Sequence, residues 1–443
     1  MSNDVKVISF LGTGNYQSTV YVWNGQEKET NFFPEAVFHF IQPTKMVICL
    51  TPGVEKSDNW STLEERFQQA HVPYEPLRIP EGHTAEDLWA IFNALTAAVQ
   101  EHEQVVFDIT HSFRSLPFLS FLVIAYLKAA KSVRVMNVLY GAFEAKDGSN
   151  RSPVFDLTPF VTLLDWLTAT EQFVQTGNAR QLSALLRSQG ENSSALKDAA
   201  LTLEGISQAA RLCQPFTLMK EVSKLEQALK KAEAEIAMDA RPFGVLRDQI
   251  VHTFSQFQCE EQDISLNKLR KEYQLIEWYF DKGQVMQAIT LAREWLIDSV
   301  TYQLGEKIKF DRDSRSPFED AINGISLVGK DHPQERGRKF TLNDLNQYGL
   351  KLWGWEETTR DLLRELWTDL KNVRNTLDHA EHQPKEAKEI SLKKLDKLQE
   401  KIDQKIRQKL QKLAALWNML ANDPDQPFHP ESGAPEQGGE RTT

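Results

Sequence analysis

Short apolar runs alternate with longer amphipathic stretches in the first third of the chain. The apolar runs predict buried strands at residues 5–10, 46–50, 105–107 and 133–140. The amphipathic stretches predict helices at residues 84–100 and 115–131. Short continuous apolar strands separated by helices are typical of a mostly parallel sheet that is covered on both faces. We therefore expect an α/β domain with a Rossmann-like sheet over residues 1–165.

Two further segments of this domain predict a β-hairpin. Residues 16–22 and 27–33 have strand-like patterns, and Asn24-Gly25 lies between them. Asn-Gly favours a tight hairpin turn because both residues tolerate a positive φ. We expect this hairpin as an insertion that projects from the sheet.

Helical patterns dominate the chain after residue 160. They predict helices at residues 160–177, 179–190, 194–209, 273–281, 285–304, 358–375 and 387–420. Residues 218–238 are rich in Lys, Glu and Ala and predict a long exposed helix or a coiled-coil arm, whereas residues 307–349 are polar and predict loops. We expect a helical linker region at 166–264, an all-α domain at 265–421 and a disordered tail at 422–443.

Composition narrows the class of protein. The 443 residues carry a formal net charge of −11, so nucleic acid would bind in a local cleft and not on a broad basic face. Cys49, Cys213 and Cys259 have no metal-ligand spacing, which indicates reduced thiols. We see no signal peptide and no apolar run long enough to span a membrane. These features predict a soluble, cytoplasmic protein without a membrane partner.

The helix predicted at residues 358–375 ends in a candidate catalytic set, Arg374, Asn375 and His379. Asn375 and His379 share a helical face, and Arg374 lies about 140° from His379. Histidine can move a proton near neutral pH, and arginine can bind a phosphate through two donors. The set suits attack of an RNA 2′-hydroxyl on its own phosphate, which requires no metal and leaves a 2′,3′-cyclic phosphate and a 5′-hydroxyl. One set covers one wall of a cleft, so we expect a second set from a two-fold partner.

An ordinary structural interpretation competes with this one. Arg374 and Asp378 would form a surface ion pair, and His379 would be a cation at the end of the helix. Arg247 and His252 repeat the spacing but lack the asparagine after the arginine. We predict that this second copy is structural.

Turns at the ends of the predicted strands contain the candidate ligand-binding residues, because ligands of doubly wound sheets bind beyond the carboxyl ends of strands. These residues are Gly12, Thr13, Gly14, Asn15, Thr51, Asp108, Thr110, His111, Ser112, Phe113, Arg114 and Gly141. Glycine lets backbone amides approach a ligand, and the helix that begins near Ser115 would favour a phosphate neutralised by Arg114. The competing interpretation is an ordinary set of tight turns, with Asp108 and Thr110 capping the next helix.

The sequence around these turns resembles a known domain. Asp108, Thr110 and His111 resemble the Asp-x-Thr-His-Gly motif of the CARF domain of CRISPR-associated proteins, with Ser112 in place of the glycine. Residues 153–160 also resemble that family.

The C-terminal part resembles the HEPN ribonucleases of CRISPR effectors. Residues 275–280 and 287–296 are similar to their first helices, and their Arg-Asn-x-x-x-His motif matches Arg374, Asn375 and His379. The whole chain thus resembles the CARF–HEPN ribonucleases, the group of type III CRISPR accessory effectors named for the Asp-x-Thr-His-Gly motif. Arg293 and Glu294 are candidates for the wall of the cleft.

The resemblance implies a homodimer that is controlled by a small ligand. A cyclic oligoadenylate, with the ring of four adenosines as the expected form, would bind across two CARF domains. The paired HEPN domains would then cut single-stranded RNA without a metal cofactor.

Three alternatives stay open. The CARF domain could also degrade its activator through Thr110, His111 and Arg114, or the HEPN fold could be inactive and only regulate. A nucleotide-binding transcription regulator would need a basic recognition helix. Residues 393–412 mix lysines with acids, so we expect no stable DNA complex.

Overall fold

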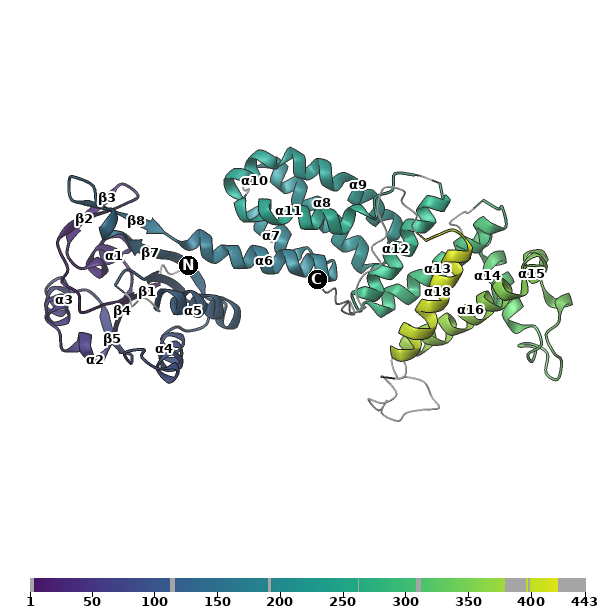
Figure 1. The fold of residues 1–443 in the computed structure, drawn as a ribbon, viewed down its shortest axis with the longest axis horizontal. Helices are drawn as coiled ribbons and strands as arrows, with labels where there is room; N and C mark the ends of the chain where they lie inside the picture. The colour runs from purple at the N-terminus through teal and green to yellow at the C-terminus, as the bar shows by residue number, and fades with distance from the viewer. Residues whose placement is uncertain are drawn as a thin grey trace, which may run out of the picture. The chain divides into compact units, whose positions relative to one another are not determined.

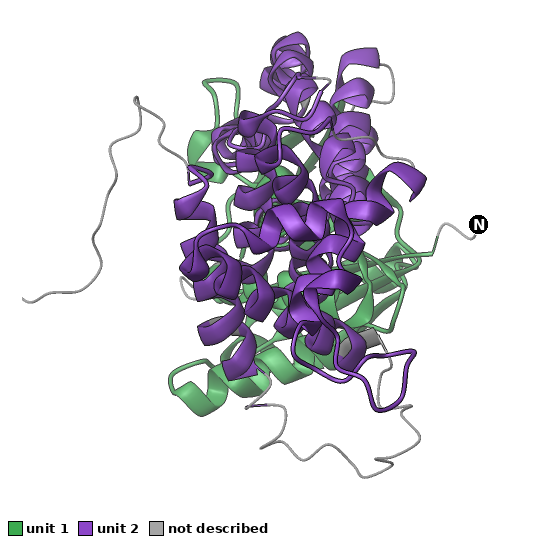
Figure 2. Cartoon of the chain, turned by 90° about the vertical axis from the view of Figure 1, so that its right-hand side faces the viewer, with its two compact units in different colours: residues 1–168 green, residues 169–443 purple. Residues whose placement is uncertain are grey.

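The computed structural model describes residues 4–111, 116–189, 193–261, 263–307, 312–378, 396 and 399–420. The chain divides into two compact units, unit 1 with residues 1–168 and unit 2 with residues 169–443 (Figure 2). Unit 1 is an α/β fold and unit 2 is helical, which confirms the predicted fold class (Figure 1). The finer division of unit 2 into a linker region and a HEPN domain stays a prediction.

Within the described residues, unit 1 contains an eight-stranded sheet in the order β3-β2-β8-β7-β6-β1-β4-β5. The strands are β1 Val5–Phe10, β2 Thr19–Trp23, β3 Gln26–Thr30, β4 Lys45–Leu50, β5 Tyr74–Arg78, β6 Gln104–Asp108, β7 Arg134–Gly141 and β8 Arg151–Asp156. All pairs from β7 across to β5 are parallel. Only β8 against β7 and β3 against β2 are antiparallel among the described pairs, so the sheet is mostly parallel.

Strand β1 shows why this sheet has a helical layer on each face. Successive side chains of a strand point to opposite faces, so Val7 packs with α1 and α3, whereas Ile8 packs with α4 and α5. The helical elements of unit 1 are α1 Phe33–Ile41, α2 Pro52–Glu55, α3 Asp58–Gln69, α4 Ala85–Ala97, α5 Leu116–Lys131, the 3-10 turn η1 Phe143–Ala145 and the start of α6 Thr158–Thr176. Burial on both faces explains why this strand is one continuous apolar run.

The predicted hairpin is present as β2 and β3, but the expectation that it projects from the sheet was wrong. Strand β2 pairs in parallel with β8, with Val20 opposite Arg151. The hairpin therefore extends the sheet beyond β8. This placement brings its side chains to the same edge as the ends of β6 and β7.

Unit 2 is built from helices that pack on their neighbours in sequence. Its elements after α6 are α7 Arg180–Gln189, α8 Ser194–Arg211, α9 Pro215–Lys231, α10 Glu233–Asp239, α11 Arg241–Ser255, α12 Leu266–Asp281, α13 Val285–Gln303, α14 Arg312–Leu327, η2 Leu342–Asp344, α15 Gln347–Trp353, α16 Glu357–Asp378, the π-helical turn η3 Lys401–Ile406 and α18 Arg407–Leu416. Helix α16 contacts α13, α14 and α18, and its core side chains include Leu363, Leu366 and Leu370.

The exposed arm predicted at residues 218–238 was wrong. Two separate helices, α9 and α10, cover this segment, and α9 packs on α8. Leu218, Val222 and Leu225 are buried in that contact. The heptad-like apolar positions thus reflect packing within unit 2.

The loop prediction for residues 307–349 was wrong for its first half. Helix α14 lies there, with Pro317 inside it and Phe318, Ile322 and Ile325 buried. The polar surface of this helix hid an apolar stripe with a spacing of three to four residues.

The long helix predicted at residues 387–420 is described only in part, as Asp396 and residues 399–420. The predicted tail at residues 422–443 lies outside the described residues. Across the part of the chain that is described, no helix has the length and apolar character needed to cross a membrane.

Candidate functional site

A cavity of about 210 Å³ lies at the carboxyl edge of the sheet in unit 1. Its walls are Asn15, Tyr16, Gln17, Tyr21, Asn31, Thr110, His111, Tyr140, Gly141, Phe143 and Glu144. Four residues predicted as ligand contacts, Asn15, Thr110, His111 and Gly141, come together here. They follow β1 and β6 or end β7, which meet at one edge because these strands are parallel.

The other predicted ligand residues are not among the described walls of this cavity. Gly12, Thr13 and Gly14 belong to the turn after β1 but do not line the cavity. Thr51 is buried and caps α2, where its hydroxyl oxygen accepts from the Val54 N–H. Ser112, Phe113 and Arg114 lie outside the described residues.

Asp108 supports the cavity from behind. Its carboxylate is fully buried and accepts hydrogen bonds from the Ser9 hydroxyl and from the Thr110 N–H, the latter at 2.9 Å. The Thr110 hydroxyl oxygen in turn accepts from the Gly141 N–H at 2.8 Å. These bonds tie the end of β6 to the end of β7, so Asp108 positions the residues that line the cavity.

His111 is held as a neutral ring. It stacks on Tyr16 with the ring centroids 4.0 Å apart, and its Nε2 accepts from the Phe33 N–H at 3.4 Å. Burial lowers the pKa of His111 to about 4. A neutral ring with an accepting Nε2 carries its proton on Nδ1. His111 therefore offers stacking and hydrogen bonding at neutral pH, but no positive charge.

The lowered pKa of His111 predicts that this residue makes a destabilising contribution to unit 1 at acid pH. The ordinary pKa is 6.5 and the folded pKa is about 4, so the unfolded chain binds a proton first and the free energy of unfolding falls as the pH drops from 6.5 to 4. We expect His111→Gln to remove up to about 3 kcal/mol of this loss. The measurement is hydrogen exchange of the buried β1 amides, compared with the unsubstituted protein at each pH.

Asp108 has the opposite effect on the pH dependence of stability, so it must be included in this comparison. Burial raises its pKa from 3.8 to about 6, so its contribution to stability grows as the pH falls through that interval. The unsubstituted protein should therefore show a shallow profile, and His111→Gln should become more stable toward pH 4. Parallel profiles for the two proteins would contradict a lowered pKa of His111.

Sequence reasoning missed Tyr140 of β7 and the residues that the hairpin and its flanking turns contribute. Tyr16, Tyr21 and Asn31 come from the turn before the hairpin, from β2 and from the residue after β3. Gly141 is required by packing, since a Cβ there would lie 2.5 Å from the Phe33 ring. The sequence does contain aromatic and amide residues next to the predicted strand ends. Their place at the cavity could be recognised only with the pairing of β2 with β8.

In unit 2, Arg374 and Asn375 lie near the end of α16 and are both exposed. Leu370 and Val373 are buried on the side of α16 that lies opposite Asn375. His379 lies outside the described residues. Asn375 thus faces outward together with Arg374, and the catalytic role of the set stays a prediction.

The second copy of the spacing has a different environment. Arg247 on α11 pairs with Glu233 at 3.6 Å and with Asp248 at 3.2 Å, and its side chain is 30% exposed. His252 is exposed on the same helix. Two carboxylates beside Arg247 oppose the binding of a phosphate there.

Arg293 and Glu294 lie within a charged network between helices. Arg293 pairs with Glu294 and with Glu319, and its guanidinium lies 5.3 Å from the centre of the Trp367 ring. Glu294 also pairs with Arg315 at 2.9 Å. These partners join α13 to α14 and α16, which fixes the helix that carries Arg374.

Buried acids complete this network. Asp298 pairs with Arg315 at 2.8 Å, and burial raises the pKa of Asp298 to about 6. Burial, together with the neighbouring Asp298, raises the pKa of Glu272 well above its usual value. Among the described residues, no three His, Cys, Asp or Glu side chains are arranged to hold a metal ion.

Comparison with known families identifies the first unit. Residues 6–144 match the family described as CRISPR system endoribonuclease Csx1, CARF domain. Unit 1 contains a CARF domain. The match spans the ends of β1, β6 and β7 that build the cavity. Residues 162–262 match the family described as CRISPR-associated protein MJ1674, second domain, which covers the helices that follow the CARF domain.

The chain is also similar to two whole proteins. CRISPR-associated protein MJ1674 of Methanocaldococcus jannaschii is 23% identical over 299 residues, which cover 63% of this chain and 44% of that protein. The chain therefore spans less than half the length of this relative. The structure of Enterococcus italicus Csm6 bound to cyclic hexa-2'-fluoro-hexa-dAMP aligns with 95% of this chain and 96% of that chain, at a TM-score of 0.43 and 9% identity. The sequence matches make the chain a relative of CRISPR-associated CARF proteins.

Proposed function

We propose that the chain is an endoribonuclease of type III CRISPR defence that a cyclic oligoadenylate activates and that needs no metal ion. The observation that carries the proposal is the CARF match over the residues that build the cavity of unit 1. A separate helical unit presents Arg374 and Asn375 on an exposed helix end. A ligand-controlled nuclease requires a unit that binds the ligand and a second unit with side chains that can bind and cleave a phosphodiester.

The chemistry of the cavity supports a nucleotide ligand. Tyr16, Tyr140 and Phe143 offer aromatic faces for stacking on a base. Asn15 and Asn31 are amides, which pair well with the edge of adenine. The described walls contain no lysine or arginine, so the phosphates would rely on backbone N–H groups and on residues outside the described ranges.

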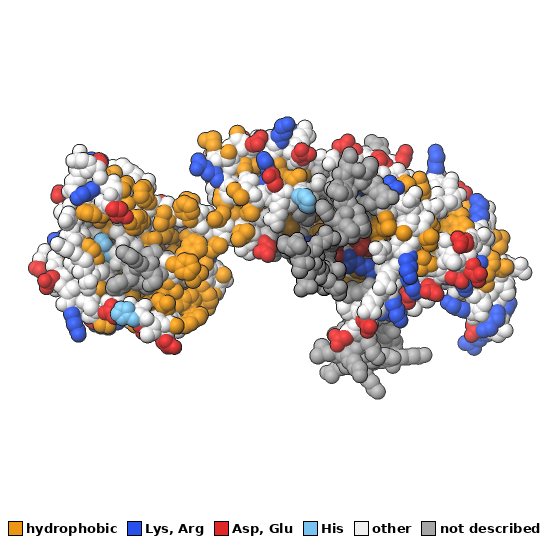
Figure 3. Space-filling model, viewed as in Figure 1, with side chains coloured by type: hydrophobic (Ala, Val, Ile, Leu, Met, Phe, Trp, Pro, Cys, Tyr) orange, Lys and Arg blue, Asp and Glu red, His pale blue; other side chains and the backbone are white. Residues whose placement is uncertain are grey.

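An apolar surface on unit 1 supports the proposed homodimer. Helix α5 lies against α4 through the contact of Phe92 with Tyr126, and against the start of α6 through the ion pair of Lys128 with Asp165. The exposed apolar side chains of these helices are Trp89, Phe118, Leu122, Tyr126, Phe160, Leu163 and Leu167. Figure 3 shows hydrophobic side chains gathered over this part of unit 1. Since α5 follows the ligand-binding turn directly, a second copy on this surface would bring two cavities to one two-fold axis.

The proposed reaction uses residues of both subunits of the dimer. The RNA 2′-oxygen attacks the adjacent phosphorus, and its proton passes to a His379 imidazole. The bond from phosphorus to the 5′-oxygen breaks, and that oxygen takes a proton from a second imidazole. Arg374 stabilises the charge on the phosphate oxygens in the transition state. The products are a 2′,3′-cyclic phosphate and a 5′-hydroxyl.

Activator dependence and metal removal test the proposal together. We expect single-stranded RNA to be cut when cyclic oligoadenylate is added, at a rate that EDTA does not change. The measurement is electrophoresis of end-labelled RNA with rings of three to six adenosines, followed by analysis of the product ends. Thr110→Ala should raise the activator concentration for half-maximal cleavage about tenfold, because one hydrogen bond between β6 and β7 is lost.

The outcomes separate the alternatives. Thr253→Ala on α11 is the matched control, because its hydroxyl donates only to a carbonyl of its own helix in the described structure, and it should leave activation unchanged. Binding of the ring without cleavage of RNA would favour the inactive regulator. Loss of the ring itself during incubation would show that the CARF domain degrades its activator.

A further inference from the structure

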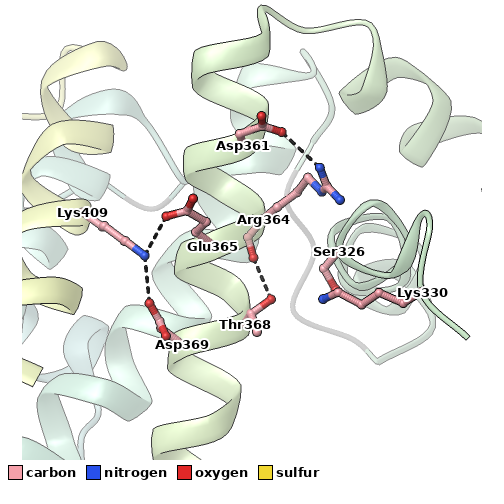
Figure 4. A pocket seen from close by; sticks show the side chains of 8 residues that line it. All are labelled: Ser326, Lys330, Asp361, Arg364, Glu365, Thr368, Asp369 and Lys409. Atoms are coloured by element: carbon pink, nitrogen blue, oxygen red, sulfur yellow. Dashed lines mark hydrogen bonds and ion pairs between the residues drawn. The ribbon is translucent and has the colours of Figure 1, made fainter. Parts of the chain in front are cut away.

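A polar cavity of about 390 Å³ lies between α14, α16 and α18 of unit 2 (Figure 4). Its walls are Ser326, Lys330, Asp361, Arg364, Glu365, Thr368, Asp369 and Lys409. We propose that this cavity binds a phosphate of the RNA strand whose cleavage takes place at Arg374. The proposal rests on the ribonuclease function and adds to it a second contact with the substrate.

The cavity and Asn375 of the motif share one face of α16. The lining residues of α16 are spaced by three and four, from Asp361 to Asp369, and so form one face of the helix. Asn375 continues this face, because it follows Thr368 by seven residues, or about 10.5 Å along the axis. A few nucleotides of a single strand would bridge this span. The cavity is therefore placed where RNA would lie on either side of the reacting phosphate.

Two cations form one side of the cavity. Arg364 donates to Asp361 at 3.1 Å and to the Val328 carbonyl at 3.4 Å. Its guanidinium lies 5.4 Å from the centre of the Trp353 ring. These contacts fix the direction of the guanidinium and leave further N–H donors for a phosphate. Lys330 is exposed after the end of α14, and among the described residues its ammonium forms no ion pair within 4.0 Å. Figure 4 shows Lys330 and Arg364 on the same side of α16.

The acids on the other side are already neutralised. Lys409 pairs with Glu365 at 2.8 Å and with Asp369 at 2.9 Å (Figure 4). Lys401 also pairs with Asp369, at 3.1 Å. Although burial opposes ionisation, the hydrogen bonds from Lys409 and Lys401 hold the pKa of Asp369 below its ordinary value. Asp369 therefore remains charged and engaged with both lysines at neutral pH.

The hydroxyl groups of the cavity are already used in hydrogen bonds, so the cations are the groups that would bind a phosphate. Ser326 and Thr368 each donate to a backbone carbonyl of their own helix, at 2.7 and 2.8 Å. Asp361 is the one carboxylate among the lining residues on the side of Lys330, and it is shared by Arg364 and Arg360. An anion is therefore the ligand that this side of the cavity accommodates, and in a ribonuclease the available anion is the RNA backbone.

Binding of RNA that cannot react tests the subsite. The probe is a fluorescent 2′-O-methyl RNA oligomer, which lacks the attacking hydroxyl, measured by anisotropy with saturating cyclic tetraadenylate at several salt concentrations. We expect Lys330→Gln to weaken binding roughly three- to ten-fold and to reduce the salt slope by about 0.7, the value for one phosphate contact on a single strand. Arg364→Lys should also weaken binding, because it removes the planar donor group but keeps the charge.

The control is Lys231→Gln, which removes one exposed lysine at the end of α9 in the same unit. It should change neither the affinity nor the salt slope. Equal binding by Lys330→Gln and Lys231→Gln, with RNA still bound and cut by the unsubstituted protein, would overturn the subsite and leave the ribonuclease function standing. Absence of RNA binding and cleavage by the unsubstituted protein would overturn both.

Discussion

Replacing Arg374 with alanine should lower the rate of RNA cleavage by the activated protein about a thousandfold or more. The guanidinium is the group proposed to hold the charge on the phosphate oxygens, and the other arginines of α16, Arg360 and Arg364, lie at least ten residues earlier in the chain. Arg374 is exposed, and alanine is favourable within a helix, so α16 should keep its packing through Leu370 and Val373. The measurement is the single-turnover rate at saturating activator, together with the affinity for the activator, which should not change.

His379→Ala tests the same reaction step through a second residue. The effects on the cleavage rate of substituting residues that act in one chemical step are not additive. Arg374→Ala, His379→Ala and the double variant should therefore lose similar amounts of activity. Two independent losses that multiply in the double variant would contradict a shared reaction step.

Arg247→Ala is the matched control because the chain repeats the spacing there. Its side chain is already paired with Glu233 and Asp248, and breaking surface pairs of this kind costs less than about 1 kcal/mol. Cleavage should therefore proceed at the normal rate. A dead enzyme with Arg247→Ala, beside an active one with Arg374→Ala, would reverse the choice between the two motifs.

The sequence predicts six strands of unit 1, including the hairpin, and misses β5 and β8. Strands β1, β4 and β6 are covered on both faces, which makes each a continuous apolar run. Strand β5 is at the edge and contains Pro76, and β8 contains Pro153 and begins with a charged residue. Proline and charge are compatible with such strands but remove the pattern by which a strand is recognised.

The residues of the candidate site fall into those that local sequence pattern predicts and those that depend on contacts distant in the sequence. Thr110, His111 and Gly141 could be found because each lies at the end of a strand that the pattern predicts. Tyr21 and Asn31 could not, since their place at the cavity depends on the pairing of β2 with β8, more than a hundred residues later in the chain. Local pattern carries no information about such a pairing.

Replacing Leu122 with aspartate should convert the proposed dimer into a monomer and remove most of the activated RNA cleavage. Leu122 is 45% exposed on α5, beside Phe118 at 70%, and Trp89 and Phe160 on the neighbouring helices are 66% and 64% exposed. Burying side chains of this size against a second copy contributes about 1.5–3 kcal/mol each, and a carboxylate placed among them would lose its hydration without gaining a partner. Both proposed sites would then be affected, because the ring would lose half of its binding surface and each Arg374 would lose its opposite wall.

The control for this charge is Leu201→Asp, which introduces the same group at an apolar side chain that is 55% exposed on α8 of unit 2. Sedimentation and light scattering would give the mass of each variant, and cleavage would be measured across a range of protein concentrations. Leu122→Asp should be monomeric and should recover activity as its concentration rises, because mass action opposes the weakened association. Leu201→Asp should match the unsubstituted protein in both measurements. A dimeric and fully active Leu122→Asp would show that the apolar surface of α4, α5 and α6 has another partner, since aspartate at its centre is incompatible with a tightly packed contact between two copies.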